Sequence, residues 1–418
     1  MIRTEMLGSG LTVVTEPMAE ARSVSIGFWV GAGSRDESDV EAGASHLLEH
    51  LLFKGTETRS AAGLAEEMDE VGGDCNAFTA KEYTAFYIRL LAEHLELGLD
   101  VLSDILWRPA LRADDLDAER HVVLDEILMH ADEPADQVAE QSSAALFPGH
   151  PLGRDVLGTA DSVGAMSADD VRSFFTRHYR PGNIVAAAAG AVDHDAVVAG
   201  LAERLGAVSG GAAPAREAPD DRVVPLVVTR RPSEQVHLVL SLRSPDRHDP
   251  GRYALALCNH VLGGGLSSRL FQEIRERRGL AYSVWSDRAA YHDAGALSLG
   301  LGTSPEHVGE ALAVVAEQLD DVIAHGVTER ELAIAKGNLR ADTLLSGEDS
   351  GARMSRIGAS TLLHGEVLEV DDLLARIEAL TVDDVRAEAA RLAGAPRSLA
   401  VVGPVDPDRF DAGALGLG

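Results

Sequence analysis

Apolar residues occur along the chain in short runs separated by polar and Gly/Pro-rich turns, and their spacing differs from run to run. Residues 23–30 and 83–90 are short and rich in β-branched and aromatic side chains, which is typical of strands. Residues 93–106 and 114–128 carry apolar residues at helical spacing, which predicts helices. Strand runs followed by helices and a further strand indicate an α+β fold, with a largely antiparallel sheet backed by helices.

The pattern occurs twice along the chain. The sequence SADDVR at 167–172 is echoed by TVDDVR at 381–386. Each copy is followed by an apolar, strand-like run, at 183–190 and at 397–403. Because the copies lie about half a chain length apart, the sequence predicts a duplicated α+β unit.

The length of the chain agrees with two domains. A chain of 418 residues exceeds one ordinary core, and 45% hydrophobic with 25% charged residues is typical of globular proteins. Residues 209–222 are small and Pro/Gly-rich, which predicts a linker. We therefore expect an N-terminal domain at 1–208 and a C-terminal domain at 223–418.

The sequence HLLEH, which begins at His46, has the H-x-x-E-H pattern of one class of zinc peptidases. Residues four apart lie on one face of a helix, so His46 and His50 can present ring nitrogens to one metal ion. Glu49 projects from nearly the same face and can reach a water molecule on that ion. The surrounding leucines predict a buried helix, with Ser45 as its N-cap. Since chance also produces this short pattern in a chain with 15 histidines, a third ligand must decide.

The candidates for a third ligand lie in the predicted helix at 114–128. Glu119 and Glu126 are two turns apart and hence on one face of that helix. Such a pair is typical of a metal ligand with a supporting carboxylate behind it. On spacing alone, the alternative is the solvated acidic face of a surface helix.

These motifs resemble the pitrilysin/insulysin family of zinc metallopeptidases, in the branch that contains mitochondrial processing peptidase and its bacterial relatives. Glu126 stands at the family's distance beyond the second His, with Glu119 where the upstream acid belongs. The resemblance implies one Zn²⁺ per chain, Glu49 as the general base and Glu119 as a group behind the ligands. The implied ligands are His46, His50 and Glu126. The resemblance also implies that the two halves of the chain face each other as a clamshell.

The sequence GGDCNAFT at 72–79 resembles the edge strand on which these enzymes place their substrate. An exposed sheet edge offers unpaired N–H and C=O groups to an extended peptide. The resemblance therefore implies that Asn76, Ala77 and Phe78 contact the substrate. On pattern alone, this stretch is a turn followed by a strand.

In the second half, Arg275 and Tyr282 stand at the family's spacing of an Arg and a Tyr that reach the active site. The resemblance implies that the Tyr282 hydroxyl donates to the oxyanion of the tetrahedral intermediate, and that Arg275 holds a substrate carbonyl. Without the resemblance, Arg275 and its neighbours Arg277 and Arg278 are an exposed basic face.

Charge and composition narrow the classes of partner. The formal net charge of −30 argues against nucleic acid and favours cationic peptides, although it also fits mere solubility or a salt-adapted host. No apolar segment at the start resembles a signal peptide, and no apolar run is long enough for a membrane span. Cys75 and Cys258 do not make a disulfide framework. We expect a cytoplasmic protein with no membrane or nucleic-acid partner.

The sequence and the resemblance together predict a zinc endopeptidase that hydrolyses extended, unfolded peptides of basic character. The resemblance implies that two chains enclose the peptide in one chamber. Because one chain carries both the metal motif and the Arg/Tyr pair, we expect a homodimer rather than an obligate heterodimer. Two alternatives stay open: a non-catalytic scaffold or partner subunit of the same fold, and a dedicated maturase of one specific peptide.

Overall fold

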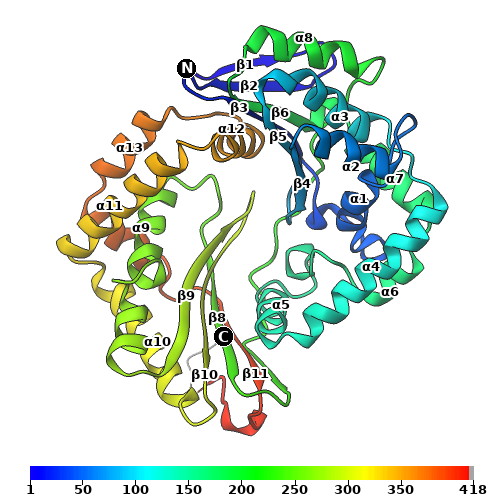
Figure 1. The fold of residues 1–418 in the computed structure, drawn as a ribbon. Helices are drawn as coiled ribbons and strands as arrows, with labels where there is room; N and C mark the ends of the chain where they lie inside the picture. Colours follow the sequence, from blue (N-terminus) through cyan, green and yellow to red (C-terminus); the bar gives the residue numbers. More distant parts are fainter. Residues whose placement is uncertain (414–418) are drawn as a thin grey trace. The chain divides into compact units, whose positions relative to one another are not determined.

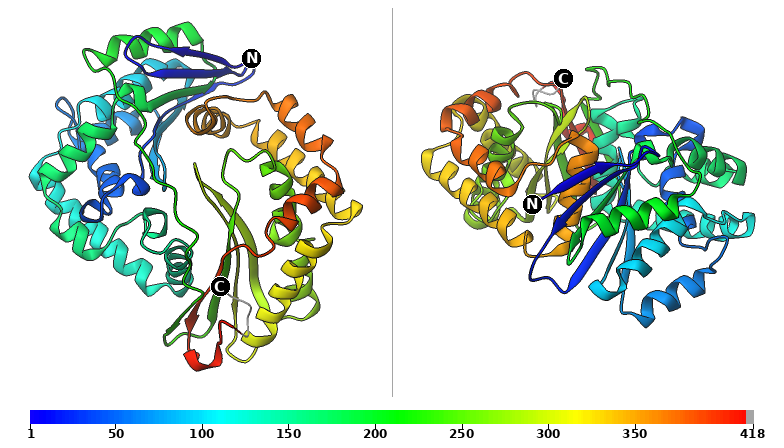
Figure 2. Two further views of the ribbon diagram at one scale, coloured as in Figure 1. Left: turned by 180° about the vertical axis from the view of Figure 1, so that it is seen from behind. Right: turned by 90° about the horizontal axis from the view of Figure 1, so that it is seen from above.

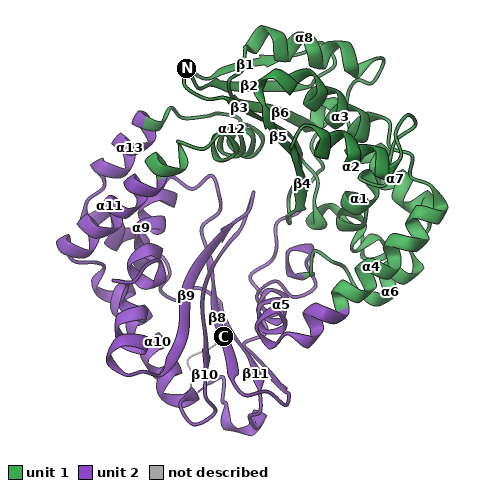
Figure 3. Cartoon of the chain, viewed as in Figure 1, with its two compact units in different colours: residues 1–127, 154–216, 343–370 green, residues 128–153, 217–342, 371–418 purple. Residues whose placement is uncertain are grey.

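The computed structural model describes residues 1–413, which fold into two compact units (Figure 3). Unit 1 consists of residues 1–127, 154–216 and 343–370. Unit 2 consists of residues 128–153 and 217–342 and continues from Asp371. Each unit has its own hydrophobic core. Among the described residues, no helix is long and apolar enough to cross a membrane.

Unit 1 is built on a six-stranded mixed sheet with the order β1-β2-β6-β3-β5-β4 (Figure 1). Only the β2–β6 pair is parallel in this sheet; the others are antiparallel. The strands are β1 (Arg3–Met6), β2 (Thr12–Pro17), β3 (Ser23–Val30), β4 (Asp74–Thr79), β5 (Thr84–Leu91) and β6 (Ile184–Gly190).

Unit 2 is built on a five-stranded sheet with the order β7-β11-β8-β10-β9. Its strands are β7 (Leu226–Arg230), β8 (Val236–Ser244), β9 (Ala281–Ala290), β10 (Gly295–Thr303) and β11 (Arg397–Gly403). The parallel β7–β11 pair followed by antiparallel partners repeats the order from β2 to β4 in unit 1. This shared topology confirms the predicted α+β fold with two similar, largely antiparallel sheets.

Helices cover the sheets of both units. Unit 1 contains α1 (Ala44–Leu52), α2 (Ala61–Glu70), α3 (Leu95–Trp107), α6 (Ala160–Ala165), α7 (Ala168–His178), α8 (His194–Leu205) and α12 (Ser350–His364). Unit 2 contains α5 (Pro134–Leu146), α9 (Arg252–Gly263), α10 (Val308–His325), α14 (Val382–Ala390) and, apart from its first residue, α13 (Val370–Ala379). The long helices α4 (Ala113–Asp132) and α11 (Glu329–Ser346) each run from one unit into the other.

The echoed sequences perform the same task in both halves. Ser167 is the N-cap of α7, and its hydroxyl accepts a hydrogen bond from the backbone N–H of Asp170 at 3.2 Å. Thr381 caps α14 in the same way, with Asp384 as the donor at 3.2 Å. Each acidic side chain bonds back to the cap residue, which completes a capping box. The repeat in the sequence is therefore a repeated helix start.

Each unit takes one helix from the opposite half of the chain. Helix α12, from the second half, packs on β6, β3 and β2 of unit 1 (Figures 1 and 2). Helix α5, from the first half, packs on β11 and β8 of unit 2. The two helices thus cover equivalent strands of the two sheets. Neither compact unit is one continuous stretch of the chain. The predicted linker at 209–222 therefore divides the sequence into halves but not into these units, and the predicted domain division stays a prediction.

Helix α12 is fixed to unit 1 by shape and by charge. Gly358 lies so close to the buried Trp29 ring that an added Cβ would stand 2.5 Å from Trp29 Cε3. The buried carboxylate of Glu16 pairs with Arg353 at 2.8 Å and with Arg356 at 3.0 Å. Both contacts require this helix at this place on the sheet.

We predict that Gly358→Ala destabilises unit 1 by about 1–3 kcal/mol, because the new methyl group overpacks the interface with Trp29. The matched control is Gly337→Ala in α11, where an added Cβ meets nothing within 4 Å. That change should raise stability by up to about 1 kcal/mol, since alanine favours a helix. Urea unfolding of both variants measures the difference, and equal stabilities would contradict the packing argument.

Candidate active site

Helix α1 begins against a buried carboxylate. The side chain of Glu37 accepts hydrogen bonds from the backbone N–H groups of Gly43, at 2.9 Å, and Ser45, at 2.7 Å. The predicted N-cap at Ser45 is wrong, because the N-cap is Gly43, in a left-handed conformation, and Ser45 is the second residue of α1. Burial raises the pKa of Glu37 to about 7, against the two N–H groups, which lower it. Sequence reasoning missed Glu37; its only signal is an acid shortly before the helix.

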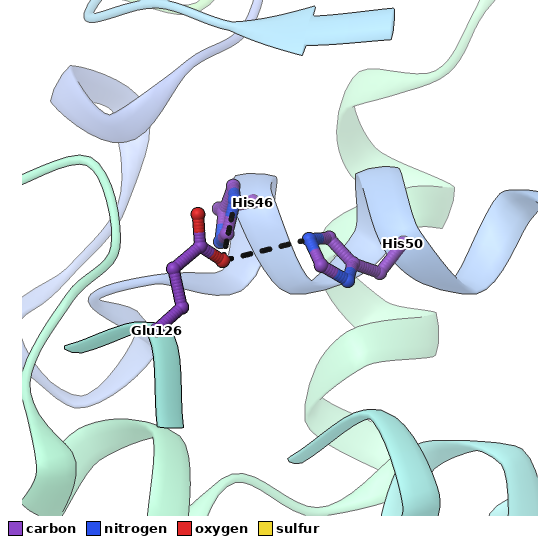
Figure 4. A group of neighbouring side chains, drawn as sticks. All are labelled: His46, His50 and Glu126. Carbon is purple, nitrogen blue, oxygen red and sulfur yellow. Dashed lines mark ion pairs between the residues drawn. The ribbon is translucent and has the colours of Figure 1, made fainter. Parts of the chain in front are cut away.

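Three side chains meet around one point in unit 1 (Figure 4). His46 and His50 project from consecutive turns of α1, and their ring centroids are 4.7 Å apart. Glu126, on α4, places Oε2 3.7 Å from His46 Nε2 and 3.9 Å from His50 Nε2. All three candidate ligand atoms lie within 4.8 Å of one another, and residues 1–413 contain no second group of this kind.

This donor set fits a zinc ion. Zinc prefers imidazole nitrogen and carboxylate oxygen at about 2.0–2.1 Å, and a tetrahedral arrangement then separates two ligand atoms by about 3.3 Å. The 3.7 and 3.9 Å from Glu126 Oε2 to the two histidine nitrogens exceed this value by only about 0.5 Å. The His50 and Glu126 side chains are 23% and 29% exposed, so one side of the group stays open to solvent. Three ligands with an open side are typical of a catalytic zinc site.

A second carboxylate orients the His50 ring. Glu119 is buried, and its Oε2 lies 3.0 Å from His50 Nδ1. The ammonium group of Lys54 pairs with the other oxygen of Glu119 at 2.7 Å. A carboxylate on Nδ1 keeps the proton there, which leaves Nε2 free to bind a metal. The role of Glu119 behind the ligands stays a prediction, for which this contact supplies the geometry. Lys54 was missed, although it follows the motif in the sequence.

Glu49 lies next to the candidate metal ligands on α1 and contacts β4. The hydroxyl of Thr79 donates a hydrogen bond to Glu49 Oε2 at 2.5 Å. Burial raises the pKa of Glu49, while the Thr79 hydroxyl acts in the opposite direction. Sequence reasoning named Glu49 but not Thr79, because the two are far apart in the chain.

Strand β4 is the last strand of its sheet, so one of its edges has no partner strand in unit 1. The backbone N–H of Ala77 donates to Oδ1 of Asn76 at 2.8 Å rather than to β5. It therefore points to the open edge. The Phe78 side chain lies on the face of β4 opposite to that of Ala77 and contacts the rings of Tyr83 and Tyr87. The predicted edge strand is confirmed, and substrate contacts of these residues stay a prediction.

A cavity of about 320 Å³ opens beside β4 between α2 and α3. Its wall is mostly apolar, and two carboxylates, Asp69 and Asp74, line it as well. Cys75, whose thiol is free, faces this cavity. The principal apolar lining residues are Phe53, Leu64, Met68, Val101 and Ile105.

Arg275 and Tyr282 belong to unit 2 and contact each other. Arg275 lies in a short π-helix, η6 (Phe271–Arg277), and its guanidinium stands 4.4 Å from the centre of the Tyr282 ring. Its Nη1 also donates to the backbone carbonyl of Tyr282 at 3.2 Å. Tyr282 is the second residue of β9, and its side chain is largely exposed. Within unit 2 the two residues form one pair, and their roles in catalysis stay predictions.

Two family models match the chain. The model of the insulinase family (peptidase family M16) matches residues 12–160, and that of the peptidase M16 inactive domain matches residues 165–339. The first match contains the complete metal group described above. The second covers most of the half that lacks such a group among its described residues.

Proteins named uncharacterized zinc proteases resemble the chain over almost its full length. The one from Mycobacterium tuberculosis is 46% identical over 96% of this chain and 93% of its own length. The one from Streptomyces coelicolor is 44% identical, over 97% and 90%. YmxG of Bacillus subtilis is 35% identical, over 97% and 98%.

Solved structures share the fold. A peptidase M16 inactive domain from Pseudomonas fluorescens superposes with a TM-score of 0.90 at 24% identity, over 97% of this chain and 98% of that one. A protease from Helicobacter pylori gives a TM-score of 0.89 at 21% identity, over 96% and 99%. At this identity the two structures show a common fold.

We predict that Glu119→Gln lowers zinc affinity by about 10–100-fold, because the His50 ring loses its charged partner. Competition with a chromophoric chelator measures the affinity. The control is Asp117→Asn, an exposed carboxylate on the same helix, which should bind zinc as the wild type does. Equal affinities in both variants would show that Glu119 does not support the ligand.

We also predict that Glu37 makes stability depend on pH. Its pKa is raised from 4.5 to about 7 on folding, so its contribution is present below pH 4.5 and is lost as the pH rises through about 7. Between pH 5.5 and pH 8, the unfolding free energy of metal-free wild type relative to Glu37→Gln should fall by about 2 kcal/mol. Glu57→Gln, at an exposed position, should show no such change relative to the wild type. A pH-independent difference for Glu37→Gln would refute the shift.

Proposed function

The chain belongs to peptidase family M16, the insulinase family of zinc proteases, and we propose that it is an endopeptidase that hydrolyses extended, unfolded peptides. One observation carries this proposal. Unit 1 brings the ligand set His46, His50 and Glu126 together with the carboxylate of Glu49. Glu49 is in turn hydrogen-bonded to the end of an open-edged strand. Metal ligands, a base and a place for a peptide backbone thus occur side by side.

The chemistry divides between the ion and the protein. A zinc ion bound by the three ligands would polarise a substrate carbonyl and lower the pKa of a water molecule. Glu49 accepts the proton of the attacking water and returns it to the leaving amine. Glu119 holds the His50 ring in the tautomer that ligation requires.

Strand β4 supports the proposed choice of substrate. An extended peptide can add to its open edge and pair with the backbone of Ala77, after the Asn76 side chain releases the Ala77 N–H. A folded protein does not offer a free strand of this kind, so the edge selects unfolded segments. The cavity beside β4 has room for a large substrate side chain.

The net charge, the Arg275–Tyr282 pair and the assembly of the protein complete the proposal. The net charge of −30 favours basic peptides by electrostatic steering. Tyr282 is assigned to the oxyanion and Arg275 to a substrate carbonyl. Because one chain carries the metal group and this pair, we propose a homodimer that encloses the peptide in a chamber. A scaffold without activity would not need an intact ligand set and base, which disfavours that alternative.

The proposal is tested by cleavage of a library of basic, unstructured peptides by the zinc-loaded protein and by Glu49→Gln. We expect the variant to keep about one zinc per chain, measured by mass spectrometry, and to lose about 10²–10⁴-fold in turnover because the base is gone. Glu57→Gln serves as the control for loss of a carboxylate elsewhere and should cleave as the wild type does.

If the zinc-loaded wild type cleaves no peptide of the library, the proposal of a general peptidase is refuted, and the alternative of a dedicated maturase of one peptide is left. A protein that binds no zinc would leave only the scaffold.

A further inference from the structure

Thr79 joins two parts of the site that the proposed function treats separately. It is the last residue of β4, and its hydroxyl donates to Oε2 of Glu49. Exposure alternates along β4, so the side chains of Cys75, Ala77 and Thr79 lie on the more buried face. Helix α1 contacts β4, and Glu49 reaches the strand from this helix. The contact therefore runs from the substrate strand to the proposed base.

The backbone of Thr79 points in a different direction from its hydroxyl. Ala77 is opposite Phe86 in the register of β4 and β5, yet its N–H turns away from β5 to Asn76. Residues two apart on a strand point the same way, so the backbone N–H and C=O of Thr79 also face the open edge. The bond from the Ala80 N–H to the carbonyl of Tyr83 fits this alternation. One residue thus offers its backbone to a peptide and its side chain to Glu49.

We propose that Thr79 is a positioning residue that couples peptide binding on β4 to the orientation of Glu49. This inference rests on the proposed peptidase function and deepens it. When a peptide pairs with the backbone of Thr79, it fixes that backbone, and the hydroxyl is fixed with it. The hydroxyl then holds one oxygen of the Glu49 carboxylate, so that the carboxylate faces the metal group in a defined orientation.

The chemistry of threonine suits this task. A β-branched side chain is stiff at its first torsion, so the place of the hydroxyl follows the backbone closely. A hydroxyl that donates to a carboxylate forms a strong, charge-assisted hydrogen bond. Glutamate has a flexible side chain, and a misplacement of about 1 Å can cost about 100-fold in rate. Without the hydroxyl, Glu49 would be present but poorly aimed.

Thr84 provides the matched control. It stands directly opposite Thr79 in the register of β4 and β5 and is fully buried. Its hydroxyl donates to the backbone carbonyl of Ala32 at 3.0 Å rather than to Glu49. Thr84→Val therefore removes the same group from the same strand pair without touching the base. A general loss of order in this part of the sheet would affect both positions.

The experiment compares Thr79→Val, Thr79→Ser and Thr84→Val as zinc-loaded full-length proteins, with a fluorogenic basic peptide that the wild type cleaves. We expect Thr79→Val to lower kcat by about 10–100-fold while KM changes less than about twofold. Thr79→Ser, which keeps the hydroxyl, should stay within about threefold of the wild type. Thr84→Val should keep the wild-type kcat.

Two further readouts do not depend on turnover. Thr79→Val should keep about one zinc per chain, and in the metal-free state it should bind the labelled peptide as tightly as the wild type, measured by fluorescence anisotropy. Wild-type kcat in Thr79→Val would overturn the inference, as would an equal loss in Thr79→Ser or Thr84→Val. A loss of zinc or of peptide affinity would assign Thr79 a structural role instead.

The experiment distinguishes failure of the proposed peptidase function from failure of the proposed role of Thr79. If the zinc-loaded wild type cleaves no peptide, the peptidase function falls and the inference falls with it. If the wild type cleaves and Thr79→Val cleaves equally well, only the coupling through Thr79 is refuted.

Discussion

The position of α1 is the constraint on which the site depends. A helix of nine residues is too short to be stable alone in water, so its surroundings must hold it. Leu47, Leu48, Leu51 and Leu52 are almost completely buried in the core of unit 1. The Glu37 carboxylate satisfies two of the backbone N–H groups at the helix start. Core packing thus sets where the helix lies, and the carboxylate sets where it begins.

Buried or half-buried carboxylates recur around this helix, and each has a defined partner. Glu37 accepts from backbone N–H groups, Glu119 is shared between an imidazole and an ammonium group, and Glu49 accepts from a hydroxyl. A buried carboxylate is costly without such partners. Glu37, Glu119 and Glu49 therefore have three different environments, all of them beside α1. In the proposed peptidase, that difference allows Glu49 to act on protons while Glu119 orients His50.

Much of this structure could be read from the sequence, because local patterns carry it. The strands at β3 and β11 begin and end where the apolar runs do, and the helix spacing of the metal motif is a property of five consecutive residues. The contacts of Lys54 and Thr79 could not be found this way, since they depend on which distant residues the fold brings near. Ser45 was mistaken for the cap because a more distant acid, Glu37, does that work. The exchange of α5 and α12 was also not visible, because an amphipathic pattern does not say which sheet a helix will cover.

The exchange of α12 has a consequence for the synthesis and the ancestry of the protein. The Trp29 face of the sheet of unit 1 stays open until residues 350–364 have left the ribosome, so the first half cannot complete its fold while it is being made. The second half, in turn, needs α5 from the first. A gene that encoded only one half could satisfy the same contacts as a pair of identical chains that swap this helix. Fusion of two such genes would turn a swapped dimer into one chain. One half could then lose its copy of the candidate metal-binding residues while the other half kept them.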